Sequence, residues 1–358
     1  MRRKPAAATA AVLVLALAAC GGSGGSGDDA QESGGKTVTL ISHDSWAASK
    51  EVIAEFEKTS GYKLKVLEDG DAGQALNKAV LTKDHPQGDV LFGVDNTLLS
   101  RALDNQLFDP YEAEEAARIG EGFRVEGDAA TPVTTGDVCV NYDKAYFEKE
   151  GLEPPNSFDD LVEPAYRNLL VTENAGTSSP GLGFLLGTAA EYGDDGWQDY
   201  WKKLRANGVK VVSGWEQAYN EEFSGSAGGK QAGGDRPLVV SYASSPPVEV
   251  IYADPQPEEA PTGVATGTCF RQIEYAGLLK NAANPEGGKA LLDFLVSQTF
   301  QEDLPLNMFV NPVRSDAALP EAFTEHGAVA EDPRTLAPEK IAANRDEWID
   351  RWTSLVVR

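Results

Sequence analysis

The chain has 358 residues, of which 41% are hydrophobic and 24% charged, and its formal net charge is −25. This composition excludes a disordered chain and is typical of a soluble globular protein, and the length favours two domains over one core. The negative charge argues against nucleic-acid binding, which needs clustered Lys and Arg. A negatively charged cleft would instead attract a cationic ligand.

The first twenty residues have the features of an export signal. Basic residues at positions 2–4 precede an apolar run, 6–17, that is too short for a stable membrane span. The segment ends in Leu17-Ala18-Ala19-Cys20, which resembles the lipobox of bacterial lipoproteins. That resemblance implies that residues 1–19 are removed and that Cys20 is lipidated. The protein is then extracytoplasmic, and the lipid alone anchors it to the outer face of the cell membrane.

Residues 20–36 are rich in Gly, Ser and acidic residues, which predicts a flexible tether. Strand and helix patterns alternate from residue 37 onward. Strands are predicted over 37–42, 63–67, 89–93, 136–142, 169–172, 209–212, 237–242 and 268–275. Helices are predicted over 49–60, 75–82, 97–105, 158–162, 180–192, 197–206, 287–296 and 339–356, with another opening at 214–219. This alternation predicts an α/β fold in which helices cover a mainly parallel sheet.

Polar residues follow the first three predicted strands. Asp44 and Ser45 come after the first strand, Asp69 and Gly70 after the second, and Asn96 after the third. Ligands of such sheets bind beyond the carboxyl ends of the strands. We therefore expect these residues to form one wall of a binding site.

A serine loop precedes the predicted helix 180–192. Ser178 and Ser179 stand before a proline suited to the first helical turn, so backbone N–H groups and hydroxyls there can receive an anion. An ordinary helix cap without a ligand is the alternative. Trp215 and Tyr242 lie near the ends of other predicted strands and offer flat stacking surfaces, although such side chains are often simply core.

The sequence lacks the motifs that are typical of metal, nucleotide and dinucleotide sites. The three histidines, His43, His85 and His326, are scattered, and there is no Cys-x-x-Cys pair, no Walker loop and no complete Gly-x-Gly-x-x-Gly. We therefore expect no metal site, no cofactor and no catalytic residues.

The chain resembles the thiamine-binding proteins of bacterial ABC importers, within the type II class of periplasmic solute-binding proteins. The similarity begins near residue 37 and is carried by the segments 67–70, 93–96, 177–183, 214–219 and 240–246. It implies a monomer with two lobes, each a mixed, mainly parallel sheet flanked by helices, joined by two crossing strands. Lobe 1 would comprise 37–133 and 268–358, and lobe 2 would comprise 134–267. Such a protein captures thiamine or its phosphates between the lobes and delivers the ligand to the permease subunits.

The resemblance also assigns residue roles. Asp69 and Gly70 match the acidic turn of the first lobe, Ser178 and Ser179 the phosphate-end loop, and Trp215 and Tyr242 aromatic residues of the cleft. The chain departs from the family in four places: His43 and Val248 replace tyrosines, Phe309 replaces a tryptophan, and no tryptophan follows Asp44-Ser45-Trp46 at the family's position near Lys50. The ligand is therefore left open between thiamine, its mono- and diphosphate, and a related pyrimidine.

The resemblance further places Cys139 and Cys269 on the two crossing strands. Adjacent strands hold Cα atoms within disulfide range, and an extracytoplasmic protein meets an oxidising environment. A disulfide is expected, with two separate buried thiols as the alternative.

Two rival functions remain. One is a type II binding protein for iron, an oxyanion or a polyamine; iron capture in that class resembles a pair of adjacent tyrosines, and Tyr242 has no tyrosine neighbour. The other is a secreted enzyme on the same fold. Thiaminase-like chemistry needs an exposed cysteine, whereas Cys139 and Cys269 lie within predicted strands.

Overall fold

The computed structural model describes residues 36–358. The export signal, Cys20 and nearly all of the tether lie outside the described residues. Within residues 36–358, no helix is both long and apolar enough to cross a membrane.

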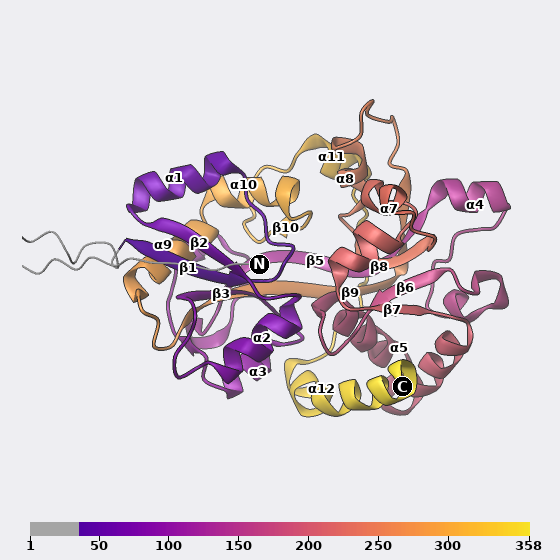
Figure 1. Ribbon diagram of the computed structural model, residues 1–358, viewed down its shortest axis with the longest axis horizontal. Helices are drawn as coiled ribbons and strands as arrows, with labels where there is room; N and C mark the ends of the chain where they lie inside the picture. Colours follow the sequence, from indigo (N-terminus) through magenta and orange to yellow (C-terminus); the bar gives the residue numbers. More distant parts are fainter. Residues whose placement is uncertain (1–35) are drawn as a thin grey trace, which may run out of the picture. The chain divides into compact units, whose positions relative to one another are not determined.

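Ten strands form one mixed sheet (Figure 1). They are β1 Thr37–Ser42, β2 Lys63–Glu68, β3 Val90–Asp95, β4 Phe108–Asp109, β5 Thr131–Asp143, β6 Leu170–Glu173, β7 Lys210–Val212, β8 Leu238–Tyr242, β9 Thr262–Leu279 and β10 Asn311–Pro312. The main order is β2-β1-β3-β9-β5-β8-β6-β7, while β10 pairs with β5 and β4 with β9. The strands at both ends pair in parallel, β1 with β2 and β3, and β6 with β7 and β8. The predicted α/β class and mixed sheet are confirmed.

Helices cover both faces of this sheet (Figure 1). The α-helices are α1 Lys50–Ser60, α2 Ala72–Leu81, α3 Leu99–Asp104, α4 Lys144–Glu150, α5 Ser179–Ala206, α6 Trp215–Gln217, α7 Ala227–Ala232, α8 Pro246–Ile251, α9 Pro285–Leu295, α10 Gln298–Asn307, α11 Glu321–His326 and α12 Pro338–Trp352. Short 3-10 turns occur at Ala116–Arg118, Glu121–Phe123, Glu126–Asp128, Asp160–Val162 and Pro164–Tyr166, and π-helical turns at Ala218–Glu222 and Thr353–Val357.

Consecutive residues of a strand point to opposite faces of the sheet and therefore pack against different layers of helices, because side chains alternate along a strand. Leu40 packs with the layer of α1, α9 and α10, whereas its neighbour Ile41 packs with α2 and α3. The same division holds for Val239, on the side of Trp215, and Val240, on the side of α5. In β3 and β8, nearly every residue is buried, and these two strands are nearly continuous apolar runs in the sequence.

Three element boundaries differ from the sequence expectation. Helix α2 starts three residues earlier than expected, because Asp71 and Gln74 form a capping box. The helices expected over 180–192 and 197–206 both form, and they meet at a kink at Gly193, whose φ is 74°, within the element labelled α5. The central strands β5 and β9 extend beyond 136–142 and 268–275, since they pair with each other along most of their length.

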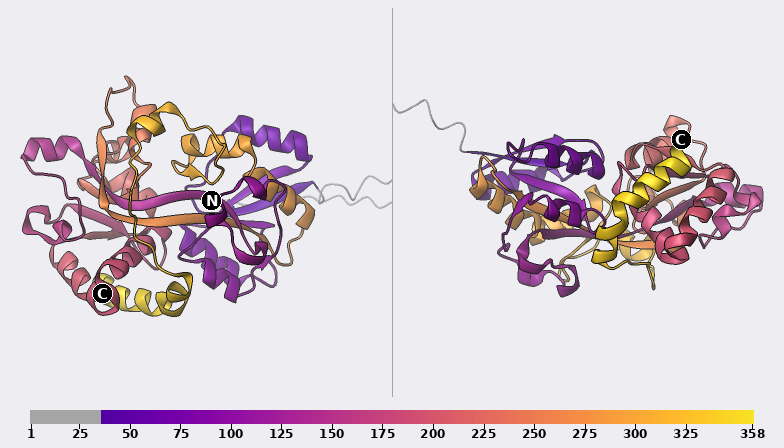
Figure 2. Two further views of the ribbon diagram at one scale, coloured as in Figure 1. Left: turned by 180° about the vertical axis from the view of Figure 1, so that it is seen from behind. Right: turned by 90° about the horizontal axis from the view of Figure 1, so that it is seen from below.

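The long strands β5 and β9 run antiparallel and side by side across the sheet (Figure 2). Their register shifts between Val138 and Val140, and there Cys139 meets Cys269. The two cysteines are fully buried and are joined by a disulfide, with Cα atoms 4.2 Å apart.

The closing helix α12 packs against α5 (Figure 2). The ring of Trp352 meets that of Trp201 edge-on at 5.4 Å, and Trp348 lies 6.3 Å from Trp197. The end of the chain therefore adjoins a helix from within 134–267 as well as α3. The lobe boundaries named above remain a prediction.

Candidate functional site

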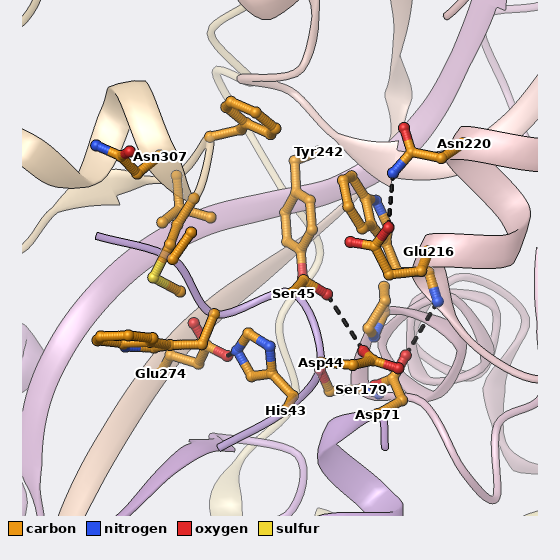
Figure 3. A pocket seen from close by; sticks show the side chains of 17 residues that line it. His43, Asp44, Ser45, Asp71, Ser179, Glu216, Asn220, Tyr242, Glu274 and Asn307 are labelled. Carbon is orange, nitrogen blue, oxygen red and sulfur yellow. Dashed lines mark hydrogen bonds and ion pairs between the residues drawn. The ribbon is translucent and has the colours of Figure 1, made fainter. Parts of the chain in front are cut away.

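A pocket of about 210 Å³ lies where several strands of the sheet end (Figure 3). Its walls come from the loop after β1, the start of α2, the starts of α5 and α6, the end of β8, one residue of β9 and the segment 307–310. Most of these positions follow the carboxyl ends of parallel strands, which is where the sequence predicted a site. The volume limits the ligand to a small molecule.

Asp71 is the central acidic residue of the pocket. Its carboxylate accepts the backbone N–H of Ala72 at 2.6 Å, that of Trp215 at 3.0 Å and that of Ser179 at 3.4 Å. The side chain is only 6% exposed, and burial raises its pKa above the ordinary value. One carboxylate thus ties the first turn of α2 to the starts of α5 and α6, elements far apart in the sequence.

His43 and Glu274 form an ion pair at another wall of the pocket. The imidazole Nε2 lies 3.2 Å from one carboxylate oxygen of Glu274, and the other oxygen accepts the hydroxyl of Thr134 at 2.8 Å. Burial alone would lower the pKa of His43, but the hydrogen bond and charge of Glu274, together with the charges of Asp71 and Asp44, raise that pKa overall. Glycine at position 93, with φ 96°, allows the imidazole to approach, since a Cβ there would lie 2.5 Å from His43 Cδ2.

Trp215 supplies an oriented aromatic surface. Its ring stacks on that of Tyr219, with centroids 5.0 Å apart and planes inclined by 12°. Its indole N–H donates to the hydroxyl of Ser241 at 2.9 Å, and Tyr219 donates to Glu249 at 3.0 Å. These contacts hold the indole in one orientation, so the surface is preorganised for a flat ligand.

The pocket is strongly acidic. Among the described residues that line it there are four carboxylates, one imidazole, and neither Lys nor Arg. The carboxylates are Asp44, which is exposed, and Asp71, Glu216 and Glu274. Glu216 accepts a hydrogen bond from Asn220 at 2.8 Å, and burial raises its pKa. In Figure 3, Glu216 and Asn220 lie on one side of the pocket, His43 and Glu274 lie on the other, and Tyr242 lies between them. A pocket with this excess of carboxylates favours a cationic ligand.

The pocket brings together five of the residues that the sequence suggested: Asp44, Ser45, Ser179, Trp215 and Tyr242. The other four are absent from its lining among the described residues: Asp69, Gly70, Asn96 and Ser178.

Each of these four residues has another environment. The carboxylate of Asp69 pairs with Lys78, and the carbonyl of Gly70 accepts the backbone N–H of Asp44. Asn96 binds backbone groups of β9, and Ser178 precedes α5 without a side-chain cap bond. The acidic group that reaches the pocket after β2 is therefore Asp71, two residues beyond Asp69.

Comparison with known proteins agrees with this architecture. Residues 86–242 match the family described as bacterial extracellular solute-binding protein. The thiamine-binding periplasmic protein of Salmonella typhimurium is 31% identical over 90% of this chain and 94% of its own length. The chain belongs to the family of thiamine-binding periplasmic proteins. The Escherichia coli protein of the same name is 30% identical with the same coverage. A solved periplasmic thiamin binding protein superposes with a TM-score of 0.77 and 28% identity over 90% of this chain and 96% of that one. The type II fold expected from the sequence is confirmed.

In this member of the thiamine-binding periplasmic protein family, the four positions at which the sequence resemblance implied a departure from the family have different locations. His43 and Phe309 line the pocket, whereas Val248 is buried in α8 and Lys50 is exposed at the start of α1. Only the first two positions can alter ligand contacts directly.

The sequence reasoning missed Asp71, Glu216 and Glu274 as site residues. The Asp71-x-x-Gln74 pattern is a capping-box signature, a local signal that could have identified Asp71 as the residue before a helix. Glu216 adjoins Trp215 within a segment already singled out. Glu274 had no local signal, because its place depends on the pairing of β9 with β3, where it stands opposite Asp95.

Proposed function

We propose that this protein is the extracytoplasmic binding component of an ABC importer and that it captures thiamine and delivers it to the permease subunits. The observation that carries the proposal is the combination of an oriented indole, Trp215, with four carboxylates in one small pocket. Thiamine joins a flat aminopyrimidine to a permanently cationic thiazolium ring. The rings match the aromatic surface and the charge matches the carboxylates. The thiamine-binding relatives support the same ligand.

The proposal includes no catalysis. Among the described residues no group of three or more His, Cys, Asp or Glu is placed to hold a metal ion. Tyr242 is the only tyrosine among the described residues that line the pocket, whereas iron capture in this class resembles a pair of adjacent tyrosines. Cys139 and Cys269 are fully buried and disulfide-bonded, so neither is placed to act as the thiolate nucleophile of a thiaminase-like enzyme. The protein is further proposed to be a monomer without a cofactor, anchored through a lipid on Cys20 as the lipobox implies.

Isothermal titration calorimetry tests the proposed ligand. The mature soluble chain, starting after Cys20, is titrated with thiamine, ferric ion and spermidine, and the thiamine is analysed afterwards by chromatography. Saturable binding of thiamine at a 1:1 ratio, with thiamine recovered intact, is the expected result. Binding of ferric ion or spermidine without binding of thiamine would refute the proposal, and breakdown of thiamine would show an enzyme.

A further inference from the structure

The carboxylate of Asp71 occupies the position that an external anion would need. The start of the long helix α5 is where the sequence predicted a phosphate site, because backbone N–H groups there are free to bind an anion. In the structure the N–H of Ser179 points at Asp71 Oδ1, 3.4 Å away, and the N–H of Trp215 at Oδ2, 3.0 Å away. The hydroxyl of Ser179 also accepts a hydrogen bond from Gln272 at 3.2 Å. The backbone N–H of Ser179, one of the predicted phosphate donors, is therefore already engaged inside the protein, as is that of Trp215.

Asp71 is held in this position by its own surroundings. Its carboxylate caps α2, and its backbone N–H donates to the side chain of Gln74 at 3.2 Å to complete the capping box. Gly214 lies directly against it, since a Cβ at that position would be 2.8 Å from Asp71 Oδ2. A phosphate that took over the N–H groups of Ser179 and Trp215 would have to displace a buried carboxylate that also caps a helix.

The rest of the pocket offers a phosphate no compensating positive charge. Its described lining includes Asp44, Glu216 and Glu274 beside Asp71, and its single basic group, the His43 imidazole, is paired with Glu274. An added phosphate would meet like charges at close range. A cationic ring system would meet a lining in which four carboxylates outnumber the one imidazole.

We propose that the pocket selects the unphosphorylated, cationic form of its ligand over phosphorylated forms, and that Asp71 is the residue that sets this preference. The inference deepens the proposed function and rests on it. Asp71 acts as an internal anion that fills the phosphate position, so thiamine binds while thiamine monophosphate and diphosphate bind weakly. We therefore expect the serine loop to bind the carboxylate of Asp71 and not the phosphate group of a ligand.

The test compares thiamine with thiamine monophosphate by calorimetry in the wild type and in two variants. Asp71→Ser keeps a residue able to cap α2 but is too short and uncharged to fill the anion position. Asp71→Asn keeps the shape and removes the charge. The wild type is expected to bind thiamine at least about tenfold more tightly than the monophosphate, and Asp71→Ser is expected to reduce that ratio by about tenfold or more. The affinity ratio of Asp71→Asn should lie between those of the wild type and Asp71→Ser.

Asp69→Asn is the matched control. It makes the same carboxylate-to-amide change after the same strand, but the carboxylate of Asp69 pairs with Lys78 and is absent from the described lining of the pocket. Its effect on the ratio should stay below about threefold, because it changes only an ion pair outside the site. A second probe, inorganic phosphate alone, should bind to Asp71→Ser and not to the wild type. This probe needs no thiamine and therefore separates the role of Asp71 from the identity of the ligand.

Each outcome decides a different point. Wild-type protein that binds the monophosphate as tightly as thiamine would overturn the proposed selectivity. A wild-type preference that persists in both Asp71 variants, with no binding of inorganic phosphate to Asp71→Ser, would overturn the role of Asp71. Wild-type protein that binds no thiamine would refute the proposed function, while phosphate binding to Asp71→Ser alone would still support the internal-anion role. Circular dichroism of each variant confirms that it is folded.

Discussion

The imidazole of His43 and the carboxylate of Glu274 lie 3.2 Å apart in the wall of the pocket, and both side chains are largely buried. A carboxylate so close stabilises the protonated imidazole, which explains why the pKa of His43 is raised despite its burial. This pair makes the stability of the protein depend on pH.

The first prediction concerns that dependence. An unfolded histidine has a pKa of about 6.5, and the folded value is higher. The His43–Glu274 pair therefore contributes its full stabilisation below about pH 6.5 and loses it as the pH rises through the folded pKa. Chemical unfolding of wild type and His43→Gln from pH 5.5 to 9 should show a stability difference that shrinks with increasing pH. Breaking such a buried pair costs up to about 3–5 kcal/mol at the acidic end.

Other buried groups also titrate in this range. Burial raises the pKa of Asp95 to about 7, so its ionisation destabilises the fold as the pH rises through that value. This contribution is present in both proteins and cancels in their difference. A difference between wild type and His43→Gln that stays constant across the range would show that His43 is not charged in the fold.

The second prediction separates two acidic residues. Glu216 lines the pocket, whereas the carboxylate of Asp69 pairs with Lys78 outside it. Glu216→Gln should weaken thiamine binding by about 1 kcal/mol or more, because it removes one charge near the cation. Asp69→Asn makes the matching carboxylate-to-amide change and should leave the affinity nearly unaltered. Calorimetry with thiamine on the two variants tests this prediction. A larger loss of affinity in Asp69→Asn than in Glu216→Gln would place the cation near Asp69.

The third prediction tests the aromatic surface. Trp215→Ala should weaken thiamine binding by about 1–3 kcal/mol, by analogy with the stacking of bases on aromatic side chains. Trp215→Phe keeps a ring that can stack but loses the hydrogen bond to Ser241, so its loss should be smaller. Equal affinities of wild type and Trp215→Ala, measured by calorimetry, would exclude stacking on this residue.

The fourth prediction concerns the disulfide between β5 and β9. The bond closes a loop with a sequence separation of 130, for which chain entropy suggests a stabilisation of about 4–5 kcal/mol. The double variant Cys139→Ala with Cys269→Ala should unfold at a correspondingly lower denaturant concentration than oxidised wild type. Peptide mapping without reduction provides the direct check. Two thiols that react with an alkylating agent in the unfolded, unreduced protein would show that the bond is absent.

The fifth prediction tests the packing of α12 on α5. Trp352 is fully buried and meets Trp201 edge-on, so Trp352→Ala should destabilise the protein by about 3–5 kcal/mol. Val357→Ala, five residues later and 48% exposed, should change the stability by less than about 0.5 kcal/mol. Thermal unfolding of both variants provides the comparison. A small effect of Trp352→Ala would mean that the last helix is only loosely attached.

The local sequence pattern was sufficient to predict most of the secondary structure. The strand β1 coincides with the predicted 37–42, and β2, β3, β6, β7 and β8 lie within two residues of their expected ends. Strands β3, β6 and β8 are buried along nearly their whole length, so their apolar residues stand out between polar turns, whereas β2 shows an alternating pattern. Helices α4, α7, α8, α10 and α11 were not predicted; all but α10 have only six or seven residues, and none carries a strong local period.

The sequence by itself determined the α/β class, the likeness to the family and the aromatic residues Trp215 and Tyr242, and the family resemblance implied that the two cysteines meet. Only the tertiary structure decided which acid after β2 reaches the pocket and that Glu274 faces His43. The physical reason is that a carboxylate's role depends on what surrounds it after folding. Asp69 meets Lys78, whereas Asp71 meets the backbone N–H groups of two helices that lie more than a hundred residues away in the chain.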